Sequence, residues 1–272
     1  MKNGVILSFV LLFATGCKDS DEKTSESNTT ETIAVPVINY AVTASLPHDT
    51  TSYTEGLLVH NGDLYESTGY DSTFAATRSL FGKIDKKSGS IDVKAELDKK
   101  KYFGEGIVFL NGKIYQLTYT TKIGFIYDAV TFKKTGEFTF PSEQGWGMTT
   151  DGASLIMTDG TNKITYLEPS GFTVVKTINV TDENGPVLYL NEPEMINGYI
   201  YANVYTKNYI VKIDPATGNV IGRLDLSSLV HEAAVKYPGL QQLNGIAYDS
   251  VSKKIYVTGK LWPTIYEITF DH

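Results

Sequence analysis

One position in a repeated sequence pattern holds five residues whose side chains could take part in chemistry. They are two carboxylates, an indole and two amides: Glu55, Glu105, Trp146, Asn191 and Asn244. Each one lies directly before an apolar segment, a turn and an alternating segment, so the five positions are equivalent. A position that served packing alone would be expected to repeat as a small or apolar residue. If the repeats surround one axis, these side chains form a chemically mixed polar ring.

A second equivalent position lies at the far end of the alternating segment. It holds Gly69, Tyr119, Gly160, Tyr205 and Lys260. Neighbouring hairpin strands end close together, so we expect Glu105 and Lys260 to share one pocket. A lysine in a cavity with carboxylates and aromatic walls suits proton transfer and the stabilisation of a developing anion. The alternative is a ring that is polar for structural reasons and only ties the repeats together.

The elements that position these residues are predicted from the repeats. The five segments are GLLVHNGDLYEST from Gly56, GIVFLNGKIYQLT from Gly106, GMTTDGASLIMTD from Gly147, EPEMINGYIYANV from Glu192 and GIAYDSVSKKIYVTG from Gly245. Asn-Gly or Asp-Gly between apolar runs favours a tight hairpin, because these residues tolerate positive φ. A second hairpin pattern follows each of the first four segments. Each repeat therefore supplies about four antiparallel strands, which is one propeller blade.

The fifth repeat ends one strand short, at PTIYEITF. The alternating segment 37–45 precedes the first repeat, and we expect it to supply the missing strand and so remove the exposed sheet edges. These patterns predict an all-β, five-bladed β-propeller over residues 37–272, whose last blade is closed by an N-terminal strand. A helix is expected at most around Leu229 to Val235. A two-sheet sandwich is the alternative fold, but it would not explain a fivefold pattern.

The start of the chain is typical of a bacterial lipoprotein. The apolar run from Val5 to Ala14 has the length of a signal peptide and is too short to span a bilayer. Small residues then precede Cys17, the single cysteine. We predict a signal peptide at residues 1–16, a lipidated Cys17 and a disordered linker through residue 36. The protein would then be exported and anchored to a membrane, in the periplasm or at the cell surface. A secretory signal that happens to carry a cysteine is the alternative.

Charge and motif content argue against several other functions. The chain has 24 Lys and Arg against 31 Asp and Glu, and it has no basic stripe, so nucleic acid is not an expected partner. The four histidines lack metal-ligand spacing, and no phosphate-binding loop or nucleophile elbow is present. We therefore expect neither a metal nor a cofactor. A closed propeller is expected to be a monomer.

Several segments resemble the plant and bacterial type of glutaminyl-peptide cyclotransferase. They are YTEGLLVHNGDLYESTG, YFGEGIVFLNGKIYQLTY, GWGMTTDGASLIMTDG, LNEPEMINGYIYANVY, LNGIAYD and KIYVTGKLWP, between about Tyr53 and Ile268. The resemblance implies a metal-independent acyltransferase with a five-bladed propeller fold. Such an enzyme converts the N-terminal glutamine of a peptide or protein to pyroglutamate and releases ammonia. A non-catalytic propeller lipoprotein that binds a peptide or sugar, and a propeller that docks partners with its faces, are the competing hypotheses.

The resemblance also implies roles for individual residues. Glu105 would move a proton from the α-amine to the departing amide nitrogen, and Lys260 would stabilise the charge that develops on the γ-carbonyl oxygen. The residues expected to bind the substrate or form the pocket walls are Tyr53, Glu55, Phe103, Trp146, Asn191, Tyr205 and Asn244. Two of these positions depart from the family pattern. Position 55 is commonly Gln and position 205 is commonly Trp, so the rate and pH profile are expected to differ.

Overall fold

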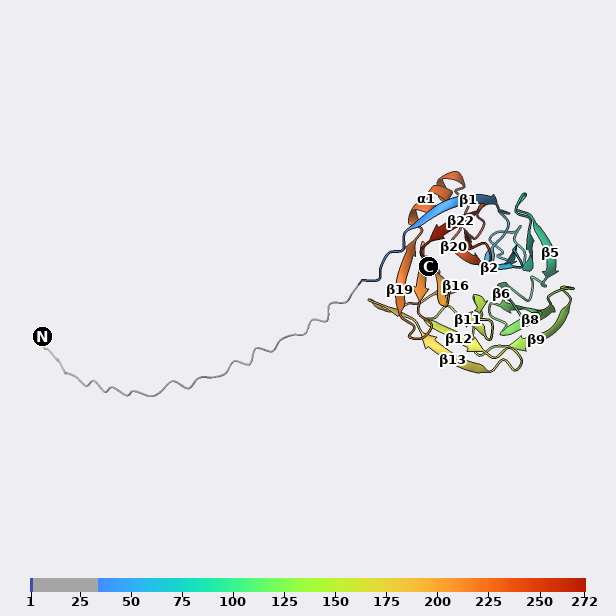
Figure 1. Cartoon of the computed structure of the whole chain (residues 1–272), viewed down its shortest axis with the longest axis horizontal. Coiled ribbons are helices and arrows are strands. Elements are labelled where there is room, and N and C mark those ends of the chain that lie inside the picture. Colours follow the sequence, from blue (N-terminus) through green and yellow to red (C-terminus); the bar gives the residue numbers. More distant parts are fainter. Residues whose placement is uncertain (2–33) are drawn as a thin grey trace. The chain divides into compact units, whose positions relative to one another are not determined.

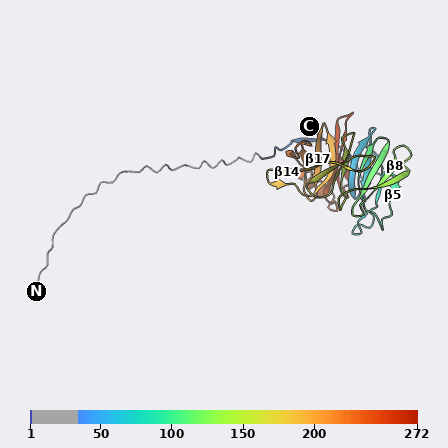
Figure 2. The same cartoon turned by 90° about the horizontal axis from the view of Figure 1, so that it is seen from below.

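The computed structural model describes Met1 and residues 34–272. Cys17, the predicted signal peptide and most of the predicted linker lie outside these residues. Five four-stranded antiparallel sheets surround a central axis (Figure 1), which confirms the predicted propeller. Seen from below, the strands of neighbouring sheets stand side by side (Figure 2). Within the described part, no helix is both long and apolar enough to cross a membrane.

The first three blades follow one another along the chain. Blade 1 contains β2 (Thr54–His60), β3 (Asp63–Thr68), β4 (Leu80–Ile84) and β5 (Ile91–Glu96). Blade 2 contains β6 (Gly104–Leu110), β7 (Lys113–Thr118), β8 (Ile123–Asp128) and β9 (Lys134–Thr139). Blade 3 contains β10 (Met148–Thr150), β11 (Leu155–Thr158), β12 (Lys163–Leu167) and β13 (Val174–Asn179).

The last two blades complete the ring. Blade 4 contains β16 (Leu190–Ile196), β17 (Tyr199–Val204), β18 (Tyr209–Ile213) and β19 (Val220–Asp225). Blade 5 contains β20 (Leu243–Asp249), β21 (Lys254–Gly259), β22 (Thr264–Phe270) and β1 (Tyr40–Pro47). A small two-stranded sheet, β14 (Thr181–Asp182) and β15 (Gly185–Pro186), lies between blades 3 and 4 in the sequence.

The N-terminal strand closes the fifth blade, as predicted. β1 pairs antiparallel with β22, from Tyr40 opposite Phe270 to Pro47 opposite Thr264, and the two strands lie side by side in Figure 1. The strand begins three residues later than the predicted start at residue 37. Residues 36–38 instead run along the outer edge of blade 4, where the Ile38 N–H donates to the Arg223 carbonyl at 2.8 Å. The N-terminal segment thus joins the outer edges of two blades.

Local sequence signals account for the inner hairpins. In the Asn-Gly turns the asparagines, Asn61, Asn111 and Asn197, have φ values of 52°, 52° and 48°. The glycine that follows each of them also has a positive φ, as a two-residue turn matched to the strand twist requires. The one helix of the described chain, α1 (Ser227–Lys236), spans the region where a helix was expected. Its Leu229 and Ala233 are buried in the core between blades 4 and 5.

Candidate active site

The innermost strands of four blades are irregular at the predicted ring residue. The pairing register with the next strand shifts at Glu55 in β2, at Glu105 in β6, at Asn191 in β16 and at Asn244 in β20. An irregularity of this kind bends the strand and re-aims a side chain. The same strand irregularity therefore recurs in four blades and re-aims the polar side chain directly before each repeat.

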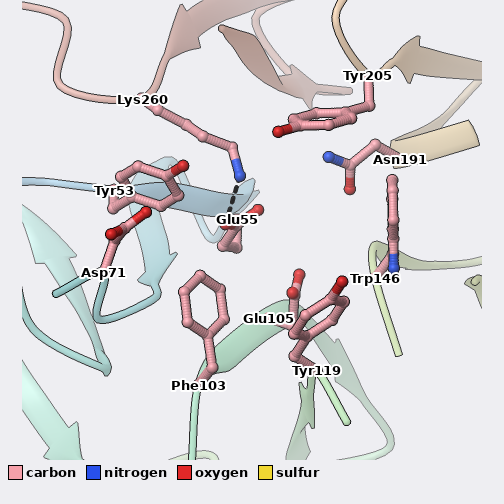
Figure 3. A pocket seen from close by; sticks show the side chains of 10 residues that line it. All are labelled: Tyr53, Glu55, Asp71, Phe103, Glu105, Tyr119, Trp146, Asn191, Tyr205 and Lys260. Atoms are coloured by element: carbon pink, nitrogen blue, oxygen red, sulfur yellow. Dashed lines mark hydrogen bonds and ion pairs between the residues drawn. The ribbon is translucent and has the colours of Figure 1, made fainter. Parts of the chain in front are cut away.

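Glu55, Glu105 and Asn191, together with Trp146 of blade 3, face one cavity of about 240 Å³, shown in Figure 3. Its lining residues are Tyr53, Glu55, Asp71, Phe103, Glu105, Tyr119, Trp146, Asn191, Tyr205 and Lys260. Every predicted catalytic or substrate-binding residue except Asn244 lies on this wall. Asp71 and Tyr119 line the cavity without having been assigned a role from sequence. Tyr119 was present in the second equivalent set, whereas Asp71 belongs to the loop between β3 and β4 and has no counterpart in the repeats.

Lys260 is held by a carboxylate and two aromatic rings. Its Nζ donates a hydrogen bond to Glu55 Oε1, and both side chains are almost completely buried. The same nitrogen lies 4.5 Å from the ring centre of Tyr53 and 5.7 Å from that of Tyr205. A desolvated ammonium is attracted to aromatic faces as well as to an anion. The lysine that was expected to share a pocket with Glu105 therefore does so, but its ion-pair partner is Glu55.

Asn244 lies behind this pair and not on the cavity wall. Its Nδ2 donates to Glu55 Oε2 at 3.2 Å and to the Thr54 carbonyl at 2.9 Å, and the residue is fully buried. The structure thus places Asn244 where it orients Glu55, which corrects the expectation of a direct substrate contact. Asn191 is different, because it lines the cavity and its buried Oδ1 has no hydrogen-bond partner among the described residues. Such an acceptor is available to a substrate N–H.

The two carboxyl groups differ in their electrostatic surroundings. Burial raises the pKa of Glu105 well above its ordinary value, and the negative charge of Glu55 raises it further against the opposing effect of Lys260. Burial also raises the pKa of Glu55, to about 7, although Lys260 lowers it by charge and hydrogen bonding. The surroundings of Glu105 thus favour its protonated form, while the charge and hydrogen bond of Lys260 favour the ionised form of Glu55. Such a pair suits proton transfer.

Two glycines at equivalent positions make room for the aromatic walls. A Cβ on Gly69 would lie 2.1 Å from the Phe103 ring, and a Cβ on Gly160 would lie 2.5 Å from the Trp146 ring. The second set of equivalent residues therefore divides into two kinds. Tyr119, Tyr205 and Lys260 contribute side chains to the cavity, whereas the glycines allow Phe103 and Trp146 to pack closely on the backbone.

The fold and the cavity define a β-propeller protein with a buried acid–base pocket at its axis. The chain belongs to the glutamine cyclotransferase family, which it matches over residues 11–270. It is 37% identical over 235 residues to a glutaminyl-peptide cyclotransferase of Arabidopsis thaliana, a match that covers 84% of this chain and 70% of the relative. The crystal structure of Myxococcus xanthus glutaminyl cyclase is similar with a TM-score of 0.78 and 32% identity, covering 87% of this chain and 98% of that one. The family resemblance seen in the sequence motifs is confirmed.

Proposed function

We propose that this chain is a glutaminyl cyclase, which converts the N-terminal glutamine of a peptide or protein to pyroglutamate and releases ammonia. The observation that carries the proposal is the buried Glu105 carboxyl group in one small cavity with the Lys260–Glu55 pair. Membership of the glutamine cyclotransferase family supports the same conclusion. A non-catalytic peptide- or sugar-binding role would not require a buried acid of raised pKa beside a lysine.

The reaction requires a bond between the α-amine nitrogen and the side-chain amide carbon, and loss of the amide nitrogen. In the proposed mechanism the protonated oxygen of Glu105 donates its proton to the departing nitrogen. The other oxygen of the same carboxyl group accepts a proton from the attacking amine. The C–N bond of the ring forms, the bond to the leaving group breaks, and ammonia departs. Glu105 ends the cycle protonated, as it began.

Lys260 is proposed to stabilise the oxygen of the attacked carbonyl. An ammonium has three N–H donors, and Glu55 takes one of those on Lys260. The others are available to the carbonyl oxygen as it gains negative charge, in a cavity where water does not screen the interaction. Asn191 Oδ1 would accept an N–H of the substrate and so fix the orientation of the glutamine. Trp146 would offer its ring face to the ammonium or to the flat amide.

Ring closure is intramolecular, so the cavity contributes mainly by shape. A glutamine side chain confined in about 240 Å³ is held folded, with its amine near its own amide carbon. Because binding already fixes this geometry, less conformational entropy is lost when the substrate reaches the transition state. The reaction is an acyl transfer from ammonia to the α-amine. We propose that no metal is needed, because Glu105 and Lys260 supply the proton transfer and the oxyanion stabilisation.

The test is ammonia release from a peptide that begins with glutamine, measured with the purified protein between pH 5 and 9. Glu105→Gln keeps the shape of the side chain but removes the acid, so we expect turnover to fall by about 100-fold or more while the fold is retained. Treatment with a strong chelator is expected to leave the rate unchanged. Near-normal turnover of the variant would overturn the assignment, and tight peptide binding without ammonia release would favour the binding-protein alternative.

Lipidation of Cys17 and a monomeric state are separate proposals. The small residues before the cysteine and the apolar run at Val5 to Ala14 support the first. Metabolic labelling with a fatty-acid analogue tests it, because Cys17→Ser should abolish incorporation. β1 completes the four-stranded sheet of the fifth blade, so this blade needs no strand from a second chain, which supports the monomer. Light scattering of the purified protein tests it.

A further inference from the structure

A second hollow adjoins the catalytic cavity on the side of Trp146. It has a volume of about 470 Å³ and is lined by residues 141–146 between β9 and β10, by residues 159–161 between β11 and β12, and by Tyr189 just before β16. We call it the exit groove. The Trp146 side chain lines both the catalytic cavity and the exit groove, so the two hollows share one wall.

The shared wall is fixed in place. Trp146 Nε1 donates to Gln144 Oε1 at 2.9 Å, and Gln144 itself lines the exit groove. The ring packs against Gly160, where a Cβ would clash with it, and meets Tyr205 edge-on at 5.7 Å between ring centres. An indole held by these contacts is a fixed boundary between the catalytic cavity and the groove.

Tyr189 presents an aromatic ring to the groove from a rigid support. Tyr189 is 54% exposed, and its backbone has a φ of 65°. The Tyr189 N–H donates to the Gly160 carbonyl at 2.9 Å, and its carbonyl accepts from the Tyr205 N–H at 2.8 Å. A left-handed backbone is unfavourable for a residue other than glycine. Residues held in this way cluster at ligand sites.

The groove also carries two carboxylates. Glu143 is strongly exposed and pairs with Lys122 at 2.5 Å. Asp159 uses Oδ1 to accept hydrogen bonds from the Thr161 N–H at 3.0 Å and from its hydroxyl at 2.5 Å. A lysine or arginine side chain laid between these carboxylates and the rings of Trp146 and Tyr189 would gain both charge and cation–π attraction. An acidic side chain there would be repelled.

We propose that the exit groove binds the two residues that follow the N-terminal glutamine of a peptide substrate, and that it favours basic over acidic side chains at those positions. This inference rests on the proposed function. Once the glutamine occupies the buried cavity, the rest of the peptide must leave through its mouth. Trp146 lines both hollows, so a peptide that leaves the cavity past this ring would reach the groove. There the carboxylates of Glu143 and Asp159 would favour basic side chains.

The experiment compares kcat/KM for three amidated peptides, Gln-Lys-Lys, Gln-Ala-Ala and Gln-Glu-Glu. We expect the basic peptide to exceed the acidic one by roughly five-fold or more at low ionic strength, mainly through KM, and the ratio to shrink with added salt. The double variant Glu143→Gln with Asp159→Asn should bring the ratio close to one. Asparagine retains the Oδ1 acceptor that Thr161 needs, so the turn is preserved.

The matched control is Glu137→Gln on β9. Glu137 pairs with Lys134 at 2.5 Å and both are exposed. This change therefore matches the Glu143→Gln part of the double variant, because it removes one charge and breaks one surface ion pair, but away from the groove. An unchanged ratio in the double variant, or an equal loss in Glu137→Gln, would overturn the inference. Glutaminamide ends before the groove. If the unmodified protein released no ammonia from glutaminamide or from any of the three peptides, the proposed function itself would fail.

Discussion

At the scale of single residues, the cavity combines three carboxyl groups, those of Glu55, Asp71 and Glu105, with one lysine. Lys260 pairs with Glu55, and Asn244 holds the second oxygen of that carboxylate. Glu105 faces the same cavity, and burial and the charge of Glu55 both raise its pKa. Glu55 therefore neutralises Lys260 in part and raises the pKa of Glu105.

Glu55→Gln should move the alkaline limb of the kcat–pH profile to lower pH. The substitution removes the negative charge that raises the pKa of Glu105, so this carboxyl group loses its proton at lower pH. Activity needs the protonated form and is lost earlier as pH rises. The measurement is kcat for ammonia release at saturating peptide from pH 5 to 10. A limb that stays in place or moves upward would contradict the coupling, and Glu96→Gln, at a surface ion pair, serves as the control.

At the scale of elements, loop glycines set the aromatic walls. Gly160 and Gly152 both have positive φ values, 77° and 87°. A Cβ on Gly160 would meet the Trp146 ring at 2.5 Å, whereas one on Gly152 would meet nothing within 4 Å. Alanine variants at Gly160 and Gly152 therefore distinguish the cost of backbone strain from the cost of displacing the Trp146 indole.

Gly160→Ala should reduce both stability and activity, and Gly152→Ala stability alone. Each alanine is forced into the left-handed region at about 1–2 kcal/mol, but only the first pushes Trp146 out of the wall shared by the cavity and the exit groove. We expect a fall in kcat/KM of about ten-fold or more for Gly160→Ala, since misplaced binding groups are costly. Tryptophan fluorescence and peptide kinetics check this result. Equal kinetics in the two variants would contradict the role assigned to Gly160.

The N-terminal strand is the element on which ring closure depends. A chain that begins at residue 48 lacks β1, so β22 loses its partner from Thr264 to Phe270 and presents an open edge. A chain that begins at residue 34 keeps β1 and also the Ile38–Arg223 hydrogen bond. We expect the longer chain to unfold cooperatively on heating and the shorter one to aggregate or lack a transition. Circular dichroism with size-exclusion chromatography distinguishes them, and two equally cooperative transitions would disprove the closure argument.

At the scale of the whole molecule, buried carboxyl groups of β16 connect the blades. Glu192 takes the place that glycine holds in the other repeats, and it accepts from the Leu57 N–H of blade 1 at 3.2 Å and the Ile246 N–H of blade 5 at 2.7 Å. Glu194 accepts from the Tyr248 N–H at 3.0 Å and from the Thr149 hydroxyl at 3.1 Å. Blade 4 is thereby tied to blades 1, 3 and 5, and desolvation raises the pKa of both carboxyl groups.

The contribution of Glu194 to stability should fall as pH rises. Burial raises its folded-state pKa to about 8, above the value in the unfolded chain, so the folded protein binds the proton more tightly. This contribution is complete below about pH 4.5 and is lost as pH rises through about 8, by at most about 1.4 kcal/mol per pH unit. Urea unfolding at pH 5, 6, 7 and 8 measures it. Glu194→Gln should show a shallower decline, and a parallel decline in both proteins would refute the assignment.

The sequence by itself determined the blade count, the inner hairpins and most of the cavity wall. These features follow from short-range patterns, such as Asn-Gly at Asn61 and Asn111, strand alternation, and a register that repeats around the ring. Equivalent positions in a closed ring face the same axis, so the repeat register alone places Glu55, Glu105, Trp146 and Asn191 together.

Only the tertiary structure decided which carboxylate Lys260 pairs with, because that depends on which blades are neighbours. Closure of the ring brings blade 5, which carries Lys260, against blade 1 and therefore against Glu55. The position of Asn244 behind Glu55 and the entry of Asp71 into the cavity depend on local bulges and on a loop outside the repeat. The raised pKa values likewise come from desolvation, which is a property of packing in three dimensions and not of residue order.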